Sequence, residues 1–279
     1  MGSGRSVCVY VADQCEGRTE ALDPDLQTYN CNDEVEVAAV DASSSKEVVF
    51  KVDRLFDGQW RGPHRHGKGV QIATDGSTYD GEWVNNAATG HGRYLHANGD
   101  VYDGQWLSDE AHGTGVYTNS IGSTYTGEWL HDKQHGQGVE VLSDGTRYEG
   151  EYKNGAKHGR GRLVYANGSV YQGCLADNLP HGEGTQSWLD GRRYVGQWVA
   201  NQMHGKGLST WKDGRQYDGE YSHDVKEGHG IFRWPDGQCY EGQWLRGRQH
   251  GSGIFINIKG ERVSAQWQEG KKLDRTAST

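Results

Sequence analysis

The sequence predicts an all-β protein made from one repeated hairpin, and three observations support this. An aromatic-x-Gly-x-aromatic segment begins every 23 residues, without insertion or deletion. His-Gly-x-Gly or a close variant follows it, and most repeats end in an Asn-Gly or Asp-Gly pair. Glycine makes up 43 of 279 residues, and 15 tyrosines and 10 tryptophans far outnumber 4 phenylalanines, so rings over glycine backbone should form the core. The nine repeats open at Phe56, Tyr79, Tyr102, Tyr125, Tyr148, Tyr171, Tyr194, Tyr217 and Tyr240.

Residues 1–47 are predicted to be an acidic, loosely ordered leader. Residues 1–55 hold 5 basic and 11 acidic side chains, which is most of the net charge of -9. An acidic chain without a basic stripe is a poor ligand for nucleic acid, so we expect no nucleic-acid partner. The scattered cysteines form no Cys-x-x-Cys pair, which favours reduced intracellular thiols over a zinc site. They are Cys8, Cys15, Cys31, Cys174 and Cys239.

A strand over residues 48–55 is expected to cap the array. The run from Val48 to Val52 is rich in β-forming residues and lies directly before the first repeat. We predict that this strand pairs with the first hairpin and shields its edge.

Residues 56–262 are predicted to form nine hairpins. In the second repeat, alternation places Tyr79, Gly81 and Trp83 on one face of a strand. A turn at Asn85-Asn86 and a His-Gly-x-Gly turn should follow, and a second strand should end at an Asp-Gly or Asn-Gly turn. The strand glycines are expected to let the rings lie against bare backbone.

Segments such as YDGEW, YTGEW and YVGQW, followed by HGxG or a close variant, resemble the MORN repeat (membrane occupation and recognition nexus). The resemblance covers nine repeats, about three quarters of the chain. It implies an elongated, twisted, single-layer antiparallel sheet of stacked hairpins, a solenoid-like rod with an aromatic groove. At roughly 10 Å per hairpin, nine repeats would span roughly 90 Å. Leu175 departs from the pattern and should weaken the ring layer of the sixth repeat.

Residues 263–270 are predicted to be a partial tenth repeat that acts as a cap, and residues 271–279 a flexible tail. The partial repeat keeps Trp267 but has Val263 and Ala265 at the other two core positions. An incompletely capped last strand offers backbone groups for pairing. Self-association through this C-terminal edge is therefore a hypothesis.

No catalytic residue, cofactor or metal site is predicted, and we expect the chain not to be an enzyme. Only 55 residues precede the repeats and 17 follow them, which leaves no room for a catalytic domain. The segment from Gly62 to Gly69 matches a phosphate loop only up to its lysine. Histidines recur at one position, but equivalent residues roughly 10 Å apart cannot share one zinc ion. They are His66, His112, His135, His158, His181, His204 and His250.

An aromatic run at the eighteenth position distinguishes repeats five to eight. With neighbouring rings it predicts a partner-binding groove of the composition favoured at protein interfaces. The alternative, in which these rings only cover backbone, stays open. The eighteenth-position residues are Tyr165, Trp188, Trp211 and Trp234, and the neighbouring rings are Tyr171, Tyr194, Trp198 and Tyr217.

We therefore expect a non-catalytic scaffold that binds an extended or helical segment of a protein partner in a larger assembly. The resemblance implies a cytoplasmic, cytoskeletal setting. Within this setting, the location we expect first is the ciliary or flagellar axoneme, including radial-spoke heads. The second is the membrane-associated cytoskeleton of protists.

A membrane adaptor is the second hypothesis. Residues 1–6 fit the N-myristoylation pattern at Gly2, with Cys8 nearby as a second acylation site, and the repeats themselves would contact lipid. The acidic leader lacks the basic patch that a single acyl chain usually needs. We therefore rank membrane binding below protein binding.

Overall fold

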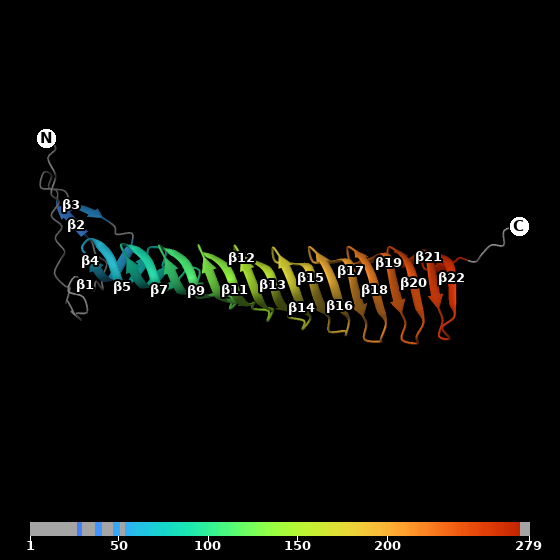
Figure 1. The fold of residues 1–279 in the computed structure, drawn as a ribbon. Helices are drawn as coiled ribbons and strands as arrows, with labels where there is room; N and C mark the ends of the chain where they lie inside the picture. The colour runs from blue at the N-terminus through green and yellow to red at the C-terminus, as the bar shows by residue number, and fades with distance from the viewer. Residues whose placement is uncertain (1–26, 30–36, 41–46, 51–53, 274–279) are drawn as a thin grey trace, which may run out of the picture. The chain divides into compact units, whose positions relative to one another are not determined.

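A computed structural model describes residues 27–29, 37–40, 47–50 and 54–273 (Figure 1). The regular structure of these residues is β-strand. The chain divides into two compact units, Met1–Lys133 and Gln134–Thr279.

The first unit is an antiparallel sheet in which strands β4 to β10 pair in chain order. Its strands are β1 (Gln27–Tyr29), β2 (Val37–Val40), β3 (Glu47–Phe50), β4 (Arg54–Arg61), β5 (His64–Ala73), β6 (Thr78–Val84), β7 (Ala87–Leu95), β8 (Val101–Leu107), β9 (Glu110–Thr118) and β10 (Thr124–Leu130).

The second unit repeats this arrangement from β11 to β23. The predicted all-β fold of successive antiparallel hairpins is thus confirmed in each unit. The strands are β11 (Lys133–Val141), β12 (Arg147–Lys153), β13 (Ala156–Val164), β14 (Val170–Ala176), β15 (Leu179–Ser187), β16 (Arg193–Val199), β17 (Gln202–Thr210), β18 (Gln216–Ser222), β19 (Val225–Arg233), β20 (Cys239–Leu245), β21 (Arg248–Ile256), β22 (Arg262–Gln268) and β23 (Lys271–Lys272).

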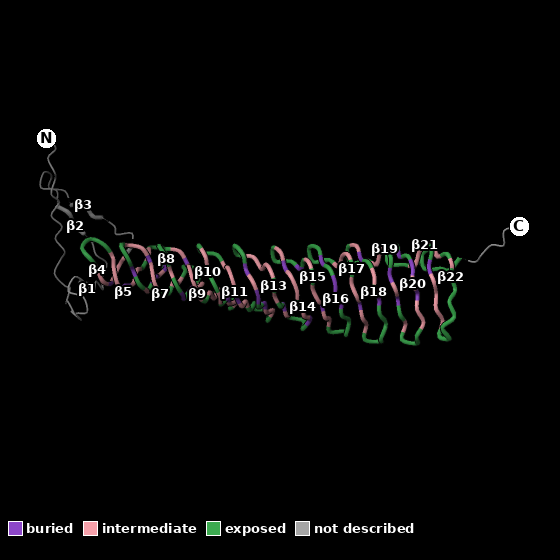
Figure 2. The backbone as a smooth tube through the Cα atoms, viewed as in Figure 1, coloured by how far each residue is buried: buried purple, intermediate pink, exposed green. Residues whose placement is uncertain are grey.

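Two kinds of turn alternate along each sheet. Within the second repeat, Asn85 and Asn86 join β6 to β7, and both have positive φ (50° and 73°), as a tight hairpin turn requires. Between repeats, the turn after β7 closes through a bond from the His96 N–H to the Asp100 carbonyl (2.8 Å), with Gly99 at φ 89°. Figure 2 shows most of these turns exposed and the buried residues within the strands.

The His-Gly-x-Gly segment lies inside the second strand of the repeat, which corrects its prediction as a turn. In β9, Gly104 pairs with Gly115 and Trp106 with Ala111, so the register shifts between these two pairs. Gly113 has φ 62° there, and the Gln105 side chain accepts a hydrogen bond from the Thr114 N–H (2.8 Å). The motif therefore marks a β-bulge, for which glycine in the left-handed region is suited.

The N-terminal capping strand differs from the prediction for residues 48–55. Strand β3 pairs with β2, whereas β1 pairs with β4 of the first repeat. Residues 54 and 55 belong to β4 itself. Two β-prone runs, Val37 to Val40 and Val48 to Phe50, thus pair with each other, and an earlier segment takes the capping place.

At the C-terminal end, the partial tenth repeat forms β22, which pairs with β21. The two-residue strand β23 covers part of β22, with Trp267 opposite Lys272. Residues 271 and 272, predicted as part of the tail, therefore belong to the sheet, whereas residues 274–279 lie outside the described part of the chain.

Candidate partner-binding surfaces

Each opening tyrosine is fixed against the backbone of its own repeat. Tyr102 is buried, and its hydroxyl donates to the Gln105 carbonyl (2.9 Å). A Cβ atom added to Gly104 or Gly115 would fall inside the van der Waals radius of this ring, so only glycine fits beneath it. The expected packing of rings over bare backbone is confirmed.

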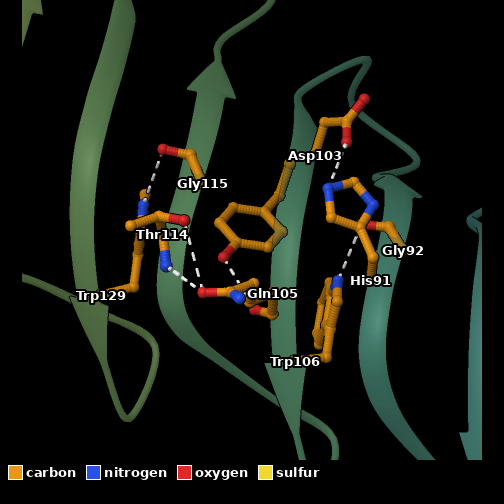
Figure 3. A network of polar contacts seen from close by, with 9 residues as sticks. His91, Gly92, Asp103, Gln105, Trp106, Thr114, Gly115 and Trp129 are labelled. Carbon is orange, nitrogen blue, oxygen red and sulfur yellow. Dashed lines mark hydrogen bonds and ion pairs between the residues drawn. The ribbon is translucent and has the colours of Figure 1, made fainter.

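Tryptophan at the fifth position ties one repeat to the next. The Trp106 indole N–H donates to the Gly92 carbonyl (2.9 Å), and that of Trp129 to the Gly115 carbonyl (3.3 Å), as Figure 3 shows. The Tyr102 ring makes edge-to-face contacts with both indoles, at centroid distances of 5.1 Å and 5.0 Å. Such contacts stabilise a sheet beyond the area they bury.

The second unit has the same series of edge-to-face ring contacts, with an aliphatic residue at one position. We call this series of rings the ladder. Tyr194, for example, meets Trp198 at 5.1 Å and Tyr221 at 5.2 Å. Leu175 occupies the fifth position of the sixth repeat and is buried at 3% exposure. The series of ring contacts is interrupted at this residue, since Leu offers no ring to Tyr148 or Tyr171, and the weakening expected there stays a prediction.

Four of the eight predicted groove residues are core residues of this ladder. Tyr171, Tyr194 and Tyr217 are 0% exposed, and Trp198 is 4% exposed. Their burial leaves no surface for a partner, because cross-strand neighbours and the fifth-position rings cover them. The alternation of side chains along a strand correctly predicted that these residues share one face of the sheet. It could not show that neighbouring side chains cover them on this face.

The four eighteenth-position residues are only partly buried, and each begins a turn between repeats. Trp188, for example, closes its turn by donating its N–H to the Arg192 carbonyl (2.9 Å). The Arg192 guanidinium lies 5.0 Å from the centre of the Trp188 ring. Trp211 likewise lies near two cations, Arg215 at 5.6 Å and Lys226 at 5.0 Å from its ring centre. Partly exposed rings thus mark the turns at Tyr165, Trp188, Trp211 and Trp234, and two of them lie beside cations.

Phe232 joins two of these residues. Its ring centre lies 5.9 Å from that of Trp211 and 4.7 Å from that of Trp234. Lys226 lies in the same cluster, and burial, followed by the charge of Arg215, lowers its pKa to about 8. The structure therefore brings Trp211 and Trp234 into one aromatic cluster around a lysine.

A groove of about 840 Å³ lies in the first unit, where the sequence had indicated no special surface. Its aromatic lining includes the half-buried rings of Tyr94, Trp106, Tyr117 and Trp129. Three carboxylates also line it, those of Asp75, Asp109 and Asp132. We call this surface the first-unit groove.

The tenth position of the repeat explains where the groove lies. It holds Ala88 and Ala111 in the second and third repeats, both buried in the groove floor, and larger residues in the other repeats. An alanine leaves open the space that a long side chain would fill. This position was the sequence signal that could have located the groove.

Hydrogen bonds fix one wall of the groove. The Tyr117 hydroxyl donates to the Asp100 carboxylate (2.5 Å), and the Ser120 N–H donates to the other oxygen (2.8 Å). These bonds lower the pKa of Asp100 to about 2, whereas burial and the bond to Asp100 raise that of Tyr117 to about 12. The Tyr117 ring is therefore held in place as a neutral phenol.

The recurrent histidines lie in the strand bulges. The Nδ1 atoms of His66 and His112 are buried without a hydrogen-bond partner among the described residues. No group of three or more His, Cys, Asp or Glu side chains in the described ranges is placed to hold a metal ion. Gly2 lies outside the described residues. Among the described residues, no helix is long and apolar enough to span a bilayer.

The hairpins, glycine contacts and ring ladder agree with a comparison against protein-family models. The MORN repeat model matches nine consecutive segments, which together cover more than half of the chain. The chain belongs to the MORN repeat family. The segments are 56–78, 79–101, 102–124, 125–147, 148–170, 171–191, 194–214, 217–239 and 240–262.

Two solved structures resemble the chain at low similarity. The TCP10 domain of Danio rerio CPAP, in complex with a STIL peptide, has a TM-score of 0.41 and 11% identity, over 72% of this chain and 95% of that domain. The TCP domain of Drosophila melanogaster SAS-4, in complex with a proline-rich motif of Ana2, has a TM-score of 0.34 and 14% identity, over 56% and 85%. Because both TM-scores lie below 0.5, we transfer neither partner to this chain. No curated protein matches the chain significantly.

Proposed function

We propose that the chain is a non-catalytic scaffold whose MORN repeats bind a segment of a protein partner across their aromatic face. One observation carries the proposal: the ladder buries its own rings, yet further rings stay partly exposed in the first-unit groove and at the turns of repeats five to eight. Partly exposed tyrosine and tryptophan beside charged groups are typical of protein interfaces.

The assembly we propose is cytoskeletal, in the cytoplasm. The ciliary or flagellar axoneme, with structures such as the radial-spoke head, is our first choice, and the membrane-associated cytoskeleton is the second. The support is the resemblance to proteins that consist of MORN repeats without an attached catalytic domain. Proximity labelling in a ciliated cell, with recovery of axonemal proteins as the expected result, tests this setting.

The protein-binding role is tested by truncating exposed rings that are not part of the ladder. Trp188→Ala combined with Trp211→Ala should lower partner recovery in crosslinking about thirtyfold or more, because each lost hot-spot ring is worth about 1 kcal/mol or more and about 1.4 kcal/mol is tenfold. The circular-dichroism spectrum should not change. Leu189→Ala is the matched control, since Leu189 is 75% exposed in the same turn as Trp188.

Two outcomes would contradict the role. Unchanged recovery by the double variant would show that these rings do not contact the partner. Loss of recovery together with unfolding would show that the rings only support the sheet.

Membrane binding through Gly2 remains the second proposal, supported by the match of residues 1–6 to the myristoylation pattern. Intact-mass measurement of the native protein should then show the added acyl chain. Failure to cosediment with mixed-lipid vesicles would count against lipid contact by the repeats.

A further inference from the structure

Three repeats fill their tenth position with a cation that lies over aromatic rings. In the first repeat, the Arg65 guanidinium lies 4.2 Å from the centre of the Trp83 ring and donates to the Asn86 carbonyl (2.9 Å). In the eighth, the Lys226 ammonium lies 4.5 to 5.1 Å from four ring centres. In the fifth, Lys157 lies 5.3 Å from the centre of Tyr148 and pairs with Glu140. The space above the tenth position therefore accepts cations.

The second and third repeats leave this space open. Ala88 and Ala111 replace the long cation, and the first-unit groove extends over both. The equivalent rings are Trp106 above Ala88 and Trp129 above Ala111, since each is the fifth residue of the following repeat, as Trp83 is for Arg65. Both indoles line the groove.

The third and fourth repeats supply negative charge at the turns beside these two spaces. The Arg65 N–H donates to the side-chain oxygen of Asn86 (2.8 Å). At the same place, the Ala88 N–H donates to the Asp109 carboxylate (2.7 Å) and the Ala111 N–H to that of Asp132 (2.7 Å). Beside the Arg65 cation the turn thus supplies the neutral amide of Asn86. Beside the open spaces over Ala88 and Ala111 it supplies a carboxylate instead.

The charge of these carboxylates reaches the rings of the groove. Burial raises the pKa of Tyr79, and the charges of Glu82 and, less strongly, of Asp109 raise it further. Burial likewise raises the pKa of Tyr102, and the charge of Asp132 raises it further. Asp75 adds a third carboxylate to a lining whose only lysine or arginine among the described residues is Arg65. The groove therefore combines aromatic faces with an excess of negative charge, which favours a basic ligand.

We infer that the first-unit groove binds a basic segment of a protein partner by taking up two arginine or lysine side chains. One lies over Trp106 beside Asp109, and the other lies over Trp129 beside Asp132. The inference rests on the proposed function and specifies its partner. Neighbouring repeats are roughly 10 Å apart. A polyproline II segment rises about 3.1 Å per residue with three residues per turn, so its residues i and i+3 lie on the same side about 9 Å apart, and the pattern is Arg-x-x-Arg or its lysine equivalent.

Fluorescence anisotropy with the full chain tests the inference. The probe is a labelled, end-capped Gly-Ser peptide that contains one Arg-x-x-Arg, and the comparison peptide carries glutamine at both arginines. The arginine peptide should bind about tenfold more tightly or better, because cation-π and charge contacts together exceed about 1.4 kcal/mol. Equal binding of the two peptides, or no binding of the arginine peptide at millimolar concentration, overturns the inference.

Two variants probe the two parts of the site. Asp109→Asn with Asp132→Asn removes the charges but keeps an oxygen for each backbone N–H, and it should weaken arginine-peptide binding about tenfold. Ala111→Arg places in the third repeat the side chain that Arg65 supplies in the first, and it should block one of the two spaces with a similar loss.

Asp224→Asn is the matched control. Asp224 holds the same turn position and accepts the Met203 N–H (2.8 Å), but it lies outside the groove. The affinity of this variant for the arginine peptide should stay within about twofold of that of the parent chain, because the substitution is distant from the groove. If all three variants bind equally, the inference falls. If partner recovery still depends on Trp188 and Trp211, the scaffold role stands without it.

Discussion

At the scale of single residues, glycine and tyrosine define the repeat together. Period-two alternation was enough to predict that Tyr102 and Gly104 share a face, because strand geometry fixes this. Alternation could not predict which rings stay exposed, because this depends on neighbours from other repeats. Tyr94 and Tyr117 pair directly with Tyr102 from the strands on either side, yet they are only partly buried.

Replacing a strand glycine tests the packing of ring on backbone. In Gly115→Ala, the new methyl group would overlap the Tyr102 ring, because Gly115 lies directly beneath it. We expect a loss of about 1–3 kcal/mol in the free energy of unfolding, as for overpacked cores. Urea denaturation measures it, and the exposed neighbour Thr114→Ala serves as control. Equal stability of the two variants would contradict this packing.

Lys226 should make stability depend on pH. Burial lowers its pKa from the ordinary 10.5 to about 8 in the folded chain, so between these pH values the unfolded chain binds more protons. Raising the pH through this window therefore favours folding at this residue. The free energy of unfolding of the parent chain, relative to Lys226→Met, should rise from pH 8 to pH 10 and stay flat below pH 7. A constant difference throughout would contradict the lowered pKa.

At the scale of the element, each repeat is a hairpin with two different turns and a bulge. The Asn and Asp residues before the second strand signalled the tight turn, since they accept positive φ. The His-Gly-x-Gly glycines signalled a bend, but local sequence alone does not separate a turn from a bulge. Pairing with Gly104 and Trp106 on the neighbouring strand decides it.

The tight turns depend on a side-chain bond to the preceding repeat. Asp224→Ala removes the acceptor of the Met203 N–H and should lower the free energy of unfolding by about 1 kcal/mol. Asp224→Asn keeps an oxygen at the same place and should lose less. Thermal unfolding followed by circular dichroism compares them. Identical midpoints would show that this bond contributes nothing to the fold.

At the scale of the whole molecule, the repeat period predicted the family and the hairpin array, whereas the surfaces that differ between repeats needed the structure. Four of the eight residues predicted for the surface at repeats five to eight lie in the core instead, as part of the ladder. They are Tyr171, Tyr194, Trp198 and Tyr217. The first-unit groove was missed because it is defined by small residues, Ala88 and Ala111, where other repeats are large. Small residues at the tenth position mark open space only once the neighbouring rings are placed.

The central claim is that this scaffold binds a partner through open aromatic space in the first unit. Indole N–H resonances in proton-nitrogen NMR, assigned by single Trp→Phe variants, test it directly during titration with the Arg-x-x-Arg peptide. We predict shifts at Trp106 and Trp129, which line the groove, and none at Trp198 and Trp244, which are buried in the second unit. Shifts confined to Trp188, Trp211 and Trp234, or no shifts at saturating peptide, would contradict the claim.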